Sequence, residues 1–232
     1  MSKVTLPVIL EPEYSDLAVA LLRDYFAPPD GWGSDFAGAH FDKIGREWSD
    51  ARYANRITAS DIVAVSTLSV DIPREAAVQL LGPATEPVGE LLAQIPLNLD
   101  LWNATDAQIG AHSPAWQLWS LLRPITGPGP TITSKLLARK RPRLIPVFDT
   151  IIGQQLGLEH AGGHWSALRE LLNQGDGPLH YQLSALGERA GLNMDRITPL
   201  RVLDVAVWYW GNPKLTKRVQ WIATDHGAAI PS

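Results

Sequence analysis

The residues best placed to do chemistry form a basic segment in the middle of the chain. No Asp or Glu occurs between Asp106 and Asp149, although the whole chain is acidic, with a formal net charge of -4. The interval carries six cations: Arg123, Lys135, Arg139, Lys140, Arg141 and Arg143. A local excess of positive charge on an acidic protein is typical of a face that binds an anionic partner, most often phosphate. A solvated helix end with its adjoining loop is the alternative interpretation.

The same segment predicts a helical hairpin with an anion site at its turn. An apolar helix over residues 114–123 is expected to end at Pro124, and residues 127–129 make a Gly-Pro-Gly turn. Pro130 then occupies the first position of a second helix, residues 130–139. Backbone amides and the dipole at a helix start attract anions. Proline has no amide hydrogen, so the expected backbone donors are Gly127, Gly129 and Thr131. The cations expected to support them are Lys135, Arg139, Lys140 and Arg141.

Most other chemistries lack the residues they need. Zero cysteines exclude disulfides, thiolate catalysis and Cys-ligated metals. His160 and His164 have the spacing of a metal-binding pair, but two glycines between them and the lack of a nearby third ligand favour a loop. Gly31-Trp32-Gly33 has no third glycine and no preceding strand, which disfavours dinucleotide binding. Neither a P-loop nor a Gly-x-Ser-x-Gly nucleophile motif occurs. We therefore expect no metal and no cofactor.

The spacing of apolar residues favours helices along almost the whole chain. Ser15 is expected to cap a helix through Tyr25 that ends at Pro28-Pro29, and Ser60 or Asp61 a helix through Leu68. Further helices are expected at residues 74–81, 86–94, 147–156, 163–173, 179–190, 199–210 and 215–225. Only residues 4–10 and, more weakly, 143–148 have the pattern of strands. Residues 27–57, rich in Gly, Asp and aromatics, are expected to form a long ordered loop laid over the domain.

Length and composition are those of a globular protein. The chain has 232 residues, of which 45% are hydrophobic and 19% charged. We expect a mainly α fold in which residues 1–232 form one compact multi-helix domain, with two lobes as the alternative. No apolar run approaches the roughly 20 residues that span a bilayer, and no secretory signal begins the sequence. The expected protein is cytoplasmic and has no membrane partner.

Residues 113–158 resemble the helix-hairpin-helix superfamily of DNA glycosylases. In that family a Gly-x-Gly hairpin between two helices precedes a Pro-Val-Asp-like element, where the catalytic aspartate begins another helix. Here Gly127-Pro128-Gly129 matches the hairpin, and Ile145-Pro146-Val147-Phe148-Asp149 matches the second element with one extra residue. Leu156-Gly157-Leu158 is similar to the short sequence that often follows. The whole chain also resembles a group of uncharacterised bacterial proteins.

The resemblance implies that Asp149 is the catalytic carboxylate of an enzyme that excises a damaged or modified base from DNA. Such a carboxylate stabilises the positive charge that develops on the deoxyribose and orients water. Bifunctional members carry a lysine at the position of Thr131, so the resemblance implies a monofunctional glycosylase. The alternative is that Asp149 only caps the helix that begins near Thr150.

An extruded base needs aromatic or apolar walls. The candidates are Trp208, Tyr209 and Trp210, with His40 in the aromatic loop. Trp116 and Trp119 are expected in the core, and Asp204 is expected to form a structural pair with Arg201.

Two further functions remain open at this point. The first is a non-catalytic DNA-binding module of the same fold. The second is a helical protein that uses the basic segment for another anion, either a nucleotide or an acidic protein partner.

Overall fold

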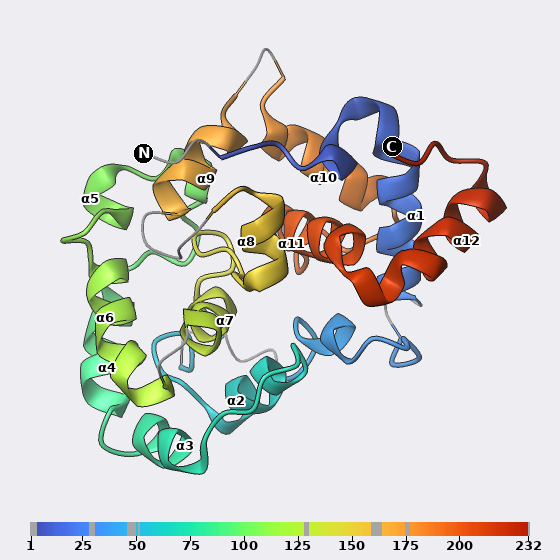
Figure 1. Cartoon of the computed structure of the whole chain (residues 1–232). Coiled ribbons are helices and arrows are strands. Elements are labelled where there is room, and N and C mark those ends of the chain that lie inside the picture. Colours follow the sequence, from blue (N-terminus) through green and yellow to red (C-terminus); the bar gives the residue numbers. More distant parts are fainter. Residues whose placement is uncertain are drawn as a thin grey trace. The chain divides into compact units, whose positions relative to one another are not determined.

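The computed structural model describes residues 4–27, 31–45, 50, 52–127, 130–158, 164–174 and 177–231 (Figure 1). Helices dominate these ranges and no strand occurs in them, so the mainly α prediction is confirmed. The chain divides into two compact units, Met1–Phe36 with Asp149–Ser232, and Ala37–Phe148. Whether the two units form one domain stays a prediction. The expected aromatic loop is divided between them, because Phe36 belongs to the first unit and Phe41 to the second.

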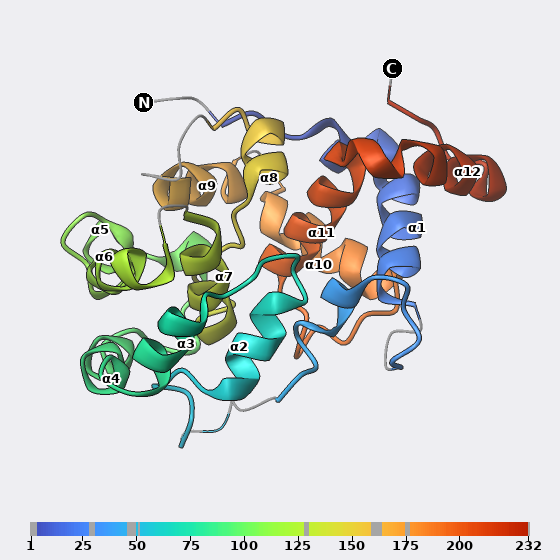
Figure 2. The same cartoon turned by 60° about the horizontal axis from the view of Figure 1, so that its bottom comes forward.

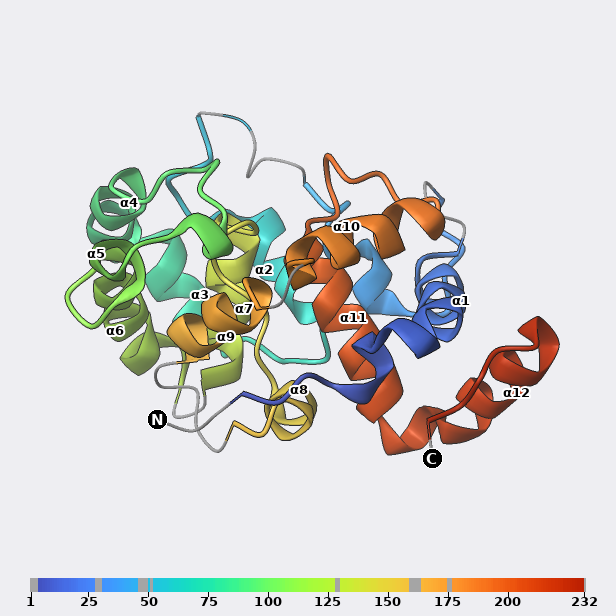
Figure 3. The same cartoon turned by 90° about the horizontal axis from the view of Figure 1, so that it is seen from above.

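The first unit is built around one buried helix. Its helices are α1 (Ser15–Phe26), α8 (Thr150–Gln155), α9 (His164–Leu172), α10 (Leu179–Arg189), α11 (Pro199–Gly211) and α12 (Thr216–His226). Helix α11 packs against α1, α8 and α10, and α12 packs on α1 (Figure 3). Thr198 caps α11 by accepting a hydrogen bond from the Arg201 amide, and Pro199 fills the first helical position. Residues 200–207 of α11 are all buried and supply the centre of this core.

The second unit contains the helical hairpin. Its helices are α2 (Ala59–Ser66), α3 (Arg74–Leu81), α4 (Thr85–Ala93), α5 (Asp106–Ile109), α6 (Pro114–Thr126) and α7 (Pro130–Lys140). Helix α6 packs against α3, α4, α5 and α7, and α7 packs against α2 (Figure 2). Ser113 caps α6 by accepting from the Trp116 amide, and Pro114 follows at the first helical position. The side chain of Trp119 is buried and stacks on that of half-buried Trp116, at 6.3 Å between ring centroids.

Both strand predictions are wrong. Residues 8–10 form a short 3₁₀ helix, and in the stretch 4–7 Thr5 N donates a backbone hydrogen bond to Leu156 O, at 3.1 Å. Residues 143–148 contain a turn followed by irregular chain. Pro7 and Pro146 lack the amide hydrogen a ladder needs, and a strand without a partner strand is not stable.

Several helix boundaries differ from the expected ones. Thr58, not Ser60 or Asp61, is the N-cap of α2, and Asp61 completes a capping box as the third helical residue. Ser15 is the first residue of α1, and its N-cap Tyr14 makes no side-chain capping bond. Helix α6 continues through Pro124 to Thr126, since a proline in the last turn removes only one helical hydrogen bond. The Pro28-Pro29 pair lies outside the described residues.

Candidate nucleic-acid interface

The hairpin predicted from the sequence is present as helices α6 and α7. Helix α6 ends at Thr126, and Gly127 has φ 106 and ψ 179, a conformation that favours glycine. A Cβ on Gly127 would meet nothing within 4 Å, so backbone conformation rather than space requires the glycine. The hydroxyls of Thr126 and Thr133 share a buried hydrogen bond of 2.6 Å that ties the two helices together. Gly129 lies outside the described residues.

The start of α7 has the features of an anion site. Pro130 is its first residue, and Thr131, the next, is half-buried. The first turn contains no acidic residue. The first amides of a helix have no partner within the helix, and the dipole places partial positive charge on them. Thr131 therefore lies where a backbone donor to phosphate is expected.

The four cations predicted to support this site point into the protein instead. Lys135, Arg139, Lys140 and Arg141 are buried, with at most 4% of each residue exposed. Each of the four donates a hydrogen bond to a residue of the second unit. The predicted exposed basic patch is therefore wrong for these four residues, because a side chain enclosed in this way does not reach a phosphate on the surface.

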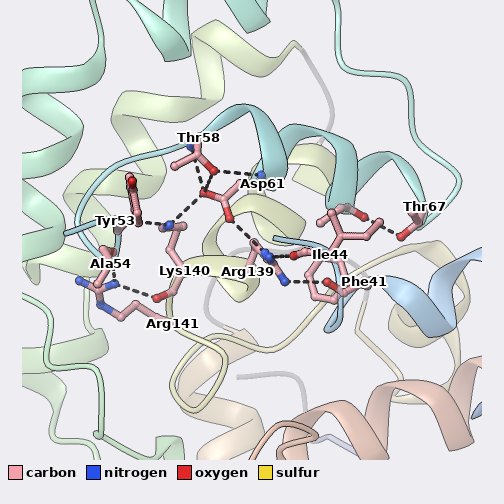
Figure 4. Close-up of polar contacts among 11 residues, drawn as sticks. Phe41, Ile44, Tyr53, Ala54, Thr58, Asp61, Thr67, Arg139, Lys140 and Arg141 are labelled. Atoms are coloured by element: carbon pink, nitrogen blue, oxygen red, sulfur yellow. Dashed lines mark hydrogen bonds and ion pairs between the residues drawn. The ribbon is translucent and has the colours of Figure 1, made fainter. Parts of the chain in front are cut away.

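The buried cations surround one carboxylate, that of Asp61 (Figure 4). Arg139 Nε donates to Asp61 Oδ1 at 3.0 Å, and Lys140 Nζ donates to Asp61 Oδ2 at 2.9 Å. The amide of Thr58 also donates to Oδ2, at 3.0 Å. Asp61 has no exposed surface. Two cations share one anion here, so the cluster keeps a net positive charge that backbone carbonyls must stabilise.

Those carbonyls come from the segment that precedes α2. Arg139 donates to the carbonyl oxygens of Phe41, at 2.6 Å, and Ile44, and Lys140 donates to that of Tyr53 at 3.0 Å. The described parts of the predicted aromatic loop in this unit are thus bound to the second helix of the hairpin (Figure 4).

Arg141 differs from its neighbours because no carboxylate contacts it among the described residues. It donates to the carbonyls of Ala54 at 3.0 Å and Ile95 at 2.8 Å, and to Asn55 Oδ1 at 2.6 Å. Burial lowers the pKa of Arg141 to about 10, and burial also lowers the pKa of Lys140. Arg141 therefore remains protonated at neutral pH and holds together three segments of this unit.

Asp149 lies in the first unit and is the N-cap of α8, the position that the alternative interpretation gives it. Asp149 Oδ1 accepts a hydrogen bond from the Ile152 amide at 2.9 Å. The residue is half-buried, and this is the one hydrogen bond of its carboxylate within the described part of the chain. The hairpin and Asp149 belong to different units.

The four residues suggested as walls of a base pocket do not fall in one unit. His40 ends a short 3₁₀ helix of the second unit, where burial and the nearby Lys43 lower its pKa. Tyr209 has no exposed surface and its hydroxyl donates to Asp24, so it is a core residue, not a pocket wall. Trp208 and Trp210 are half-buried.

Two structural predictions can be resolved in the first unit. The predicted pair of Arg201 and Asp204 is confirmed as a buried salt bridge on α11. His164 is buried, whereas His160 lies outside the described residues.

The described residues contain no group of three His, Cys, Asp or Glu side chains that could hold a metal ion. None of the described helices is long and apolar enough to cross a membrane.

A family model matches most of the chain, residues 18–211, from within α1 to the end of α11. The chain belongs to DUF6308, a family of unknown function. No curated protein and no solved structure matches the chain. The match confirms the resemblance to an uncharacterised family and carries no information about DNA glycosylases.

Sequence reasoning named Asp61 only as a candidate helix cap of this DUF6308 chain and missed its contacts with Arg139 and Lys140. A signal for the cap existed in the pattern Thr58-x-x-Asp61 ahead of an apolar run, which is that of a capping box. The pattern shows that the carboxylate folds back on its own helix. Its second role, to neutralise cations 78 and 79 residues away, depends on tertiary packing.

The cap at Asp149 leads to a stability prediction for this DUF6308 chain. Asp149→Asn should leave the free energy of unfolding nearly unchanged, because Asn is an equally good N-cap. Asp149→Ala should lower it by about 1 kcal/mol. Urea denaturation followed by circular dichroism measures both. If the Asn variant loses as much stability as the Ala variant, the negative charge rather than the cap holds α8.

Proposed function

We propose that this protein binds duplex DNA through the hairpin of α6 and α7. The observation that carries the proposal is the hairpin itself: two helices tied by Thr126 and Thr133, a glycine turn at Gly127, and a second helix that starts at Pro130 with no acidic residue in its first turn. A hairpin of this kind is the DNA-binding element of the family that residues 113–158 resemble.

The contact is made by backbone amides near Thr131 rather than by the basic run. Amides at a helix N-terminus bind phosphate without a charged side chain. Helix α6 contributes one cation near the hairpin turn, Arg123, which lies in the last turn of the helix. The guanidinium of Arg123 lies over the Trp119 ring, 6.0 Å from the ring centroid. Arg123 is half-buried, so part of it is available to a phosphate.

Because backbone amides rather than the buried cations contact phosphate, we expect a modest salt dependence for duplex binding. Each phosphate neutralised by a cation contributes about -0.9 to the slope of log K against log salt concentration. Four such contacts from Lys135, Arg139, Lys140 and Arg141 would contribute about -3.6, and we expect a shallower slope because all four are buried. Fluorescence anisotropy over a range of salt concentrations measures it. A slope steeper than -3.6 would show that the buried cations turn outward, and no binding at low salt would contradict the proposal.

Removal of a base is the second candidate function, favoured by the half-buried carboxylate of Asp149 at the start of α8. In that reaction the bond between C1′ of the deoxyribose and the base nitrogen breaks, and the base leaves with the electron pair and gains a proton from solvent water. A water oxygen bonds to C1′, and Asp149 accepts its proton. Thr131 provides no amine for a Schiff base, so the reaction is hydrolysis alone.

Asp149→Asn separates excision from binding alone. The variant keeps the cap of α8, so it should bind a duplex with an abasic-site analogue as tightly as the wild type and release no base. The substrates are duplexes that each carry one damaged or modified base, and an abasic product is detected by alkaline strand cleavage. If the wild type binds the duplexes but releases no base, the non-catalytic DNA-binding module is the favoured function. Binding of acidic peptides but not duplexes would favour the acidic protein partner.

A further inference from the structure

The outward face of α12 carries an exposed tryptophan between lysines and polar residues. Trp221 is 63% exposed, although tryptophan is among the residues that gain most from burial. Helix α12 lies in the first unit and packs on α1 (Figure 3). Its buried side consists of Val219, Ile222 and Ala223, so the helix is anchored without Trp221.

Helical spacing places two lysines on the same face as Trp221. Lys217 precedes Trp221 by four residues, and Lys214, in the short 3₁₀ turn before the helix, precedes Lys217 by three. Residues three or four apart are neighbours on a helix surface. Both lysines are exposed. The stripe formed by Lys214, Lys217 and Trp221, here called the α12 stripe, therefore combines an indole face with two positive charges.

The charge of the α12 stripe is only partly cancelled by the carboxylates described around it. Asp24 and Asp35 are both paired with Arg218, at 2.8 Å and 3.1 Å. Among the described residues, no Asp or Glu lies within salt-bridge distance of Lys214 or Lys217. The one acidic residue of α12 is Asp225, which follows Trp221 by four residues and so lies on the same face, 4.0 Å from His226. The face therefore carries two positive charges before Trp221 and one negative charge after it. The stripe is thus complementary to an anion that also has a flat apolar surface.

We propose that the α12 stripe binds unpaired nucleotides of a single-stranded nucleic acid. The Trp221 indole stacks on a base, and the ammonium groups of Lys217 and Lys214 contact successive phosphates. Stacked aromatic side chains with flanking cations are the usual means of binding single strands without sequence preference. An acidic peptide would satisfy the lysines but would offer no flat ring to Trp221. This inference goes beyond the proposed function, because it concerns single strands and a surface other than the hairpin.

The test compares two equally exposed aromatic residues of the first unit. Tyr181 on α10 is 67% exposed, and no lysine or arginine precedes or follows it by three or four residues. Trp221→Ala should weaken binding of a labelled oligothymidylate by at least about fivefold, the lower range for loss of one stacked base. Tyr181→Ala should leave the affinity unchanged. Fluorescence anisotropy with the full chain measures both.

The lysines have a separate readout. Lys214→Gln with Lys217→Gln should make the slope of log K against log salt shallower by about 1.4, since each contact with a single-strand phosphate contributes about -0.7. Equal loss of affinity in the Trp221 and Tyr181 variants, or an unchanged slope, overturns the inference. So does displacement of the oligonucleotide by polyglutamate at equal charge, which would identify an acidic peptide as the partner.

Failure of this inference is distinguishable from failure of the proposed function. If Trp221→Ala binds both the duplex and the oligothymidylate as tightly as the wild type, the α12 stripe proposal fails and the hairpin proposal stands. If the protein binds no duplex but binds the oligothymidylate in a way that depends on Trp221, the hairpin proposal fails and the α12 stripe proposal stands.

Discussion

Replacing Asp61 with Asn is expected to lower the free energy of unfolding by about 3–5 kcal/mol at neutral pH. The side chain has no exposed surface and is the carboxylate that faces both Arg139 and Lys140. Asparagine has almost the same shape and keeps one acceptor for the capping box of α2. It removes the negative charge and turns amide hydrogens toward a buried cation. The cost is therefore that of leaving two buried positive charges without their counterion.

Urea denaturation of the two proteins measures this loss, with Asp50→Asn as the matched control. Asp50 also pairs with an arginine, Arg52, in the same unit, but that pair is largely exposed to solvent. An exposed pair contributes little to stability, so the control should unfold at the wild-type urea concentration. An Asp61→Asn variant as stable as the control would mean that the cluster is not held by this carboxylate.

Local signals in the sequence predicted the helices well. The hairpin follows from the glycine turn and from Pro114 and Pro130, which occupy first helical positions. The cap at Asp149 follows from the preference of Asp for that position. These features depend on residues within one or two turns, and a single sequence contains them in full.

The direction of the basic side chains could not be predicted in the same way. A run of Lys and Arg without acidic neighbours indicates a surface when only nearby residues are considered. The partner of Arg139 and Lys140 is Asp61, on a different helix and far away in the sequence. The other partners are backbone carbonyls, such as that of Ala54, which carry no signature in residue type. Tertiary packing therefore converted a predicted DNA-binding patch into an internal support for the hairpin helix.

Replacing Thr131 with Glu is expected to weaken duplex binding by at least about tenfold, because a negative charge beside a bound phosphate is costly. Thr131 is the second residue of α7 and is half-buried. A glutamate in the first turn of a helix is favourable with respect to the helix dipole. The variant should therefore fold as stably as the wild type, and its loss of affinity would report on the interface itself.

The measurement that tests the account most directly is an anisotropy titration of one labelled duplex with the wild type, Thr131→Glu and Gln117→Glu. Gln117 is exposed on α6, ten residues before Gly127 and thus about 15 Å away along the helix. At that distance its added charge is largely screened at physiological salt. We expect wild-type affinity for Gln117→Glu and a loss of at least about tenfold for Thr131→Glu. Equal affinity of all three proteins for the duplex would contradict the assignment of the hairpin as the DNA-binding element.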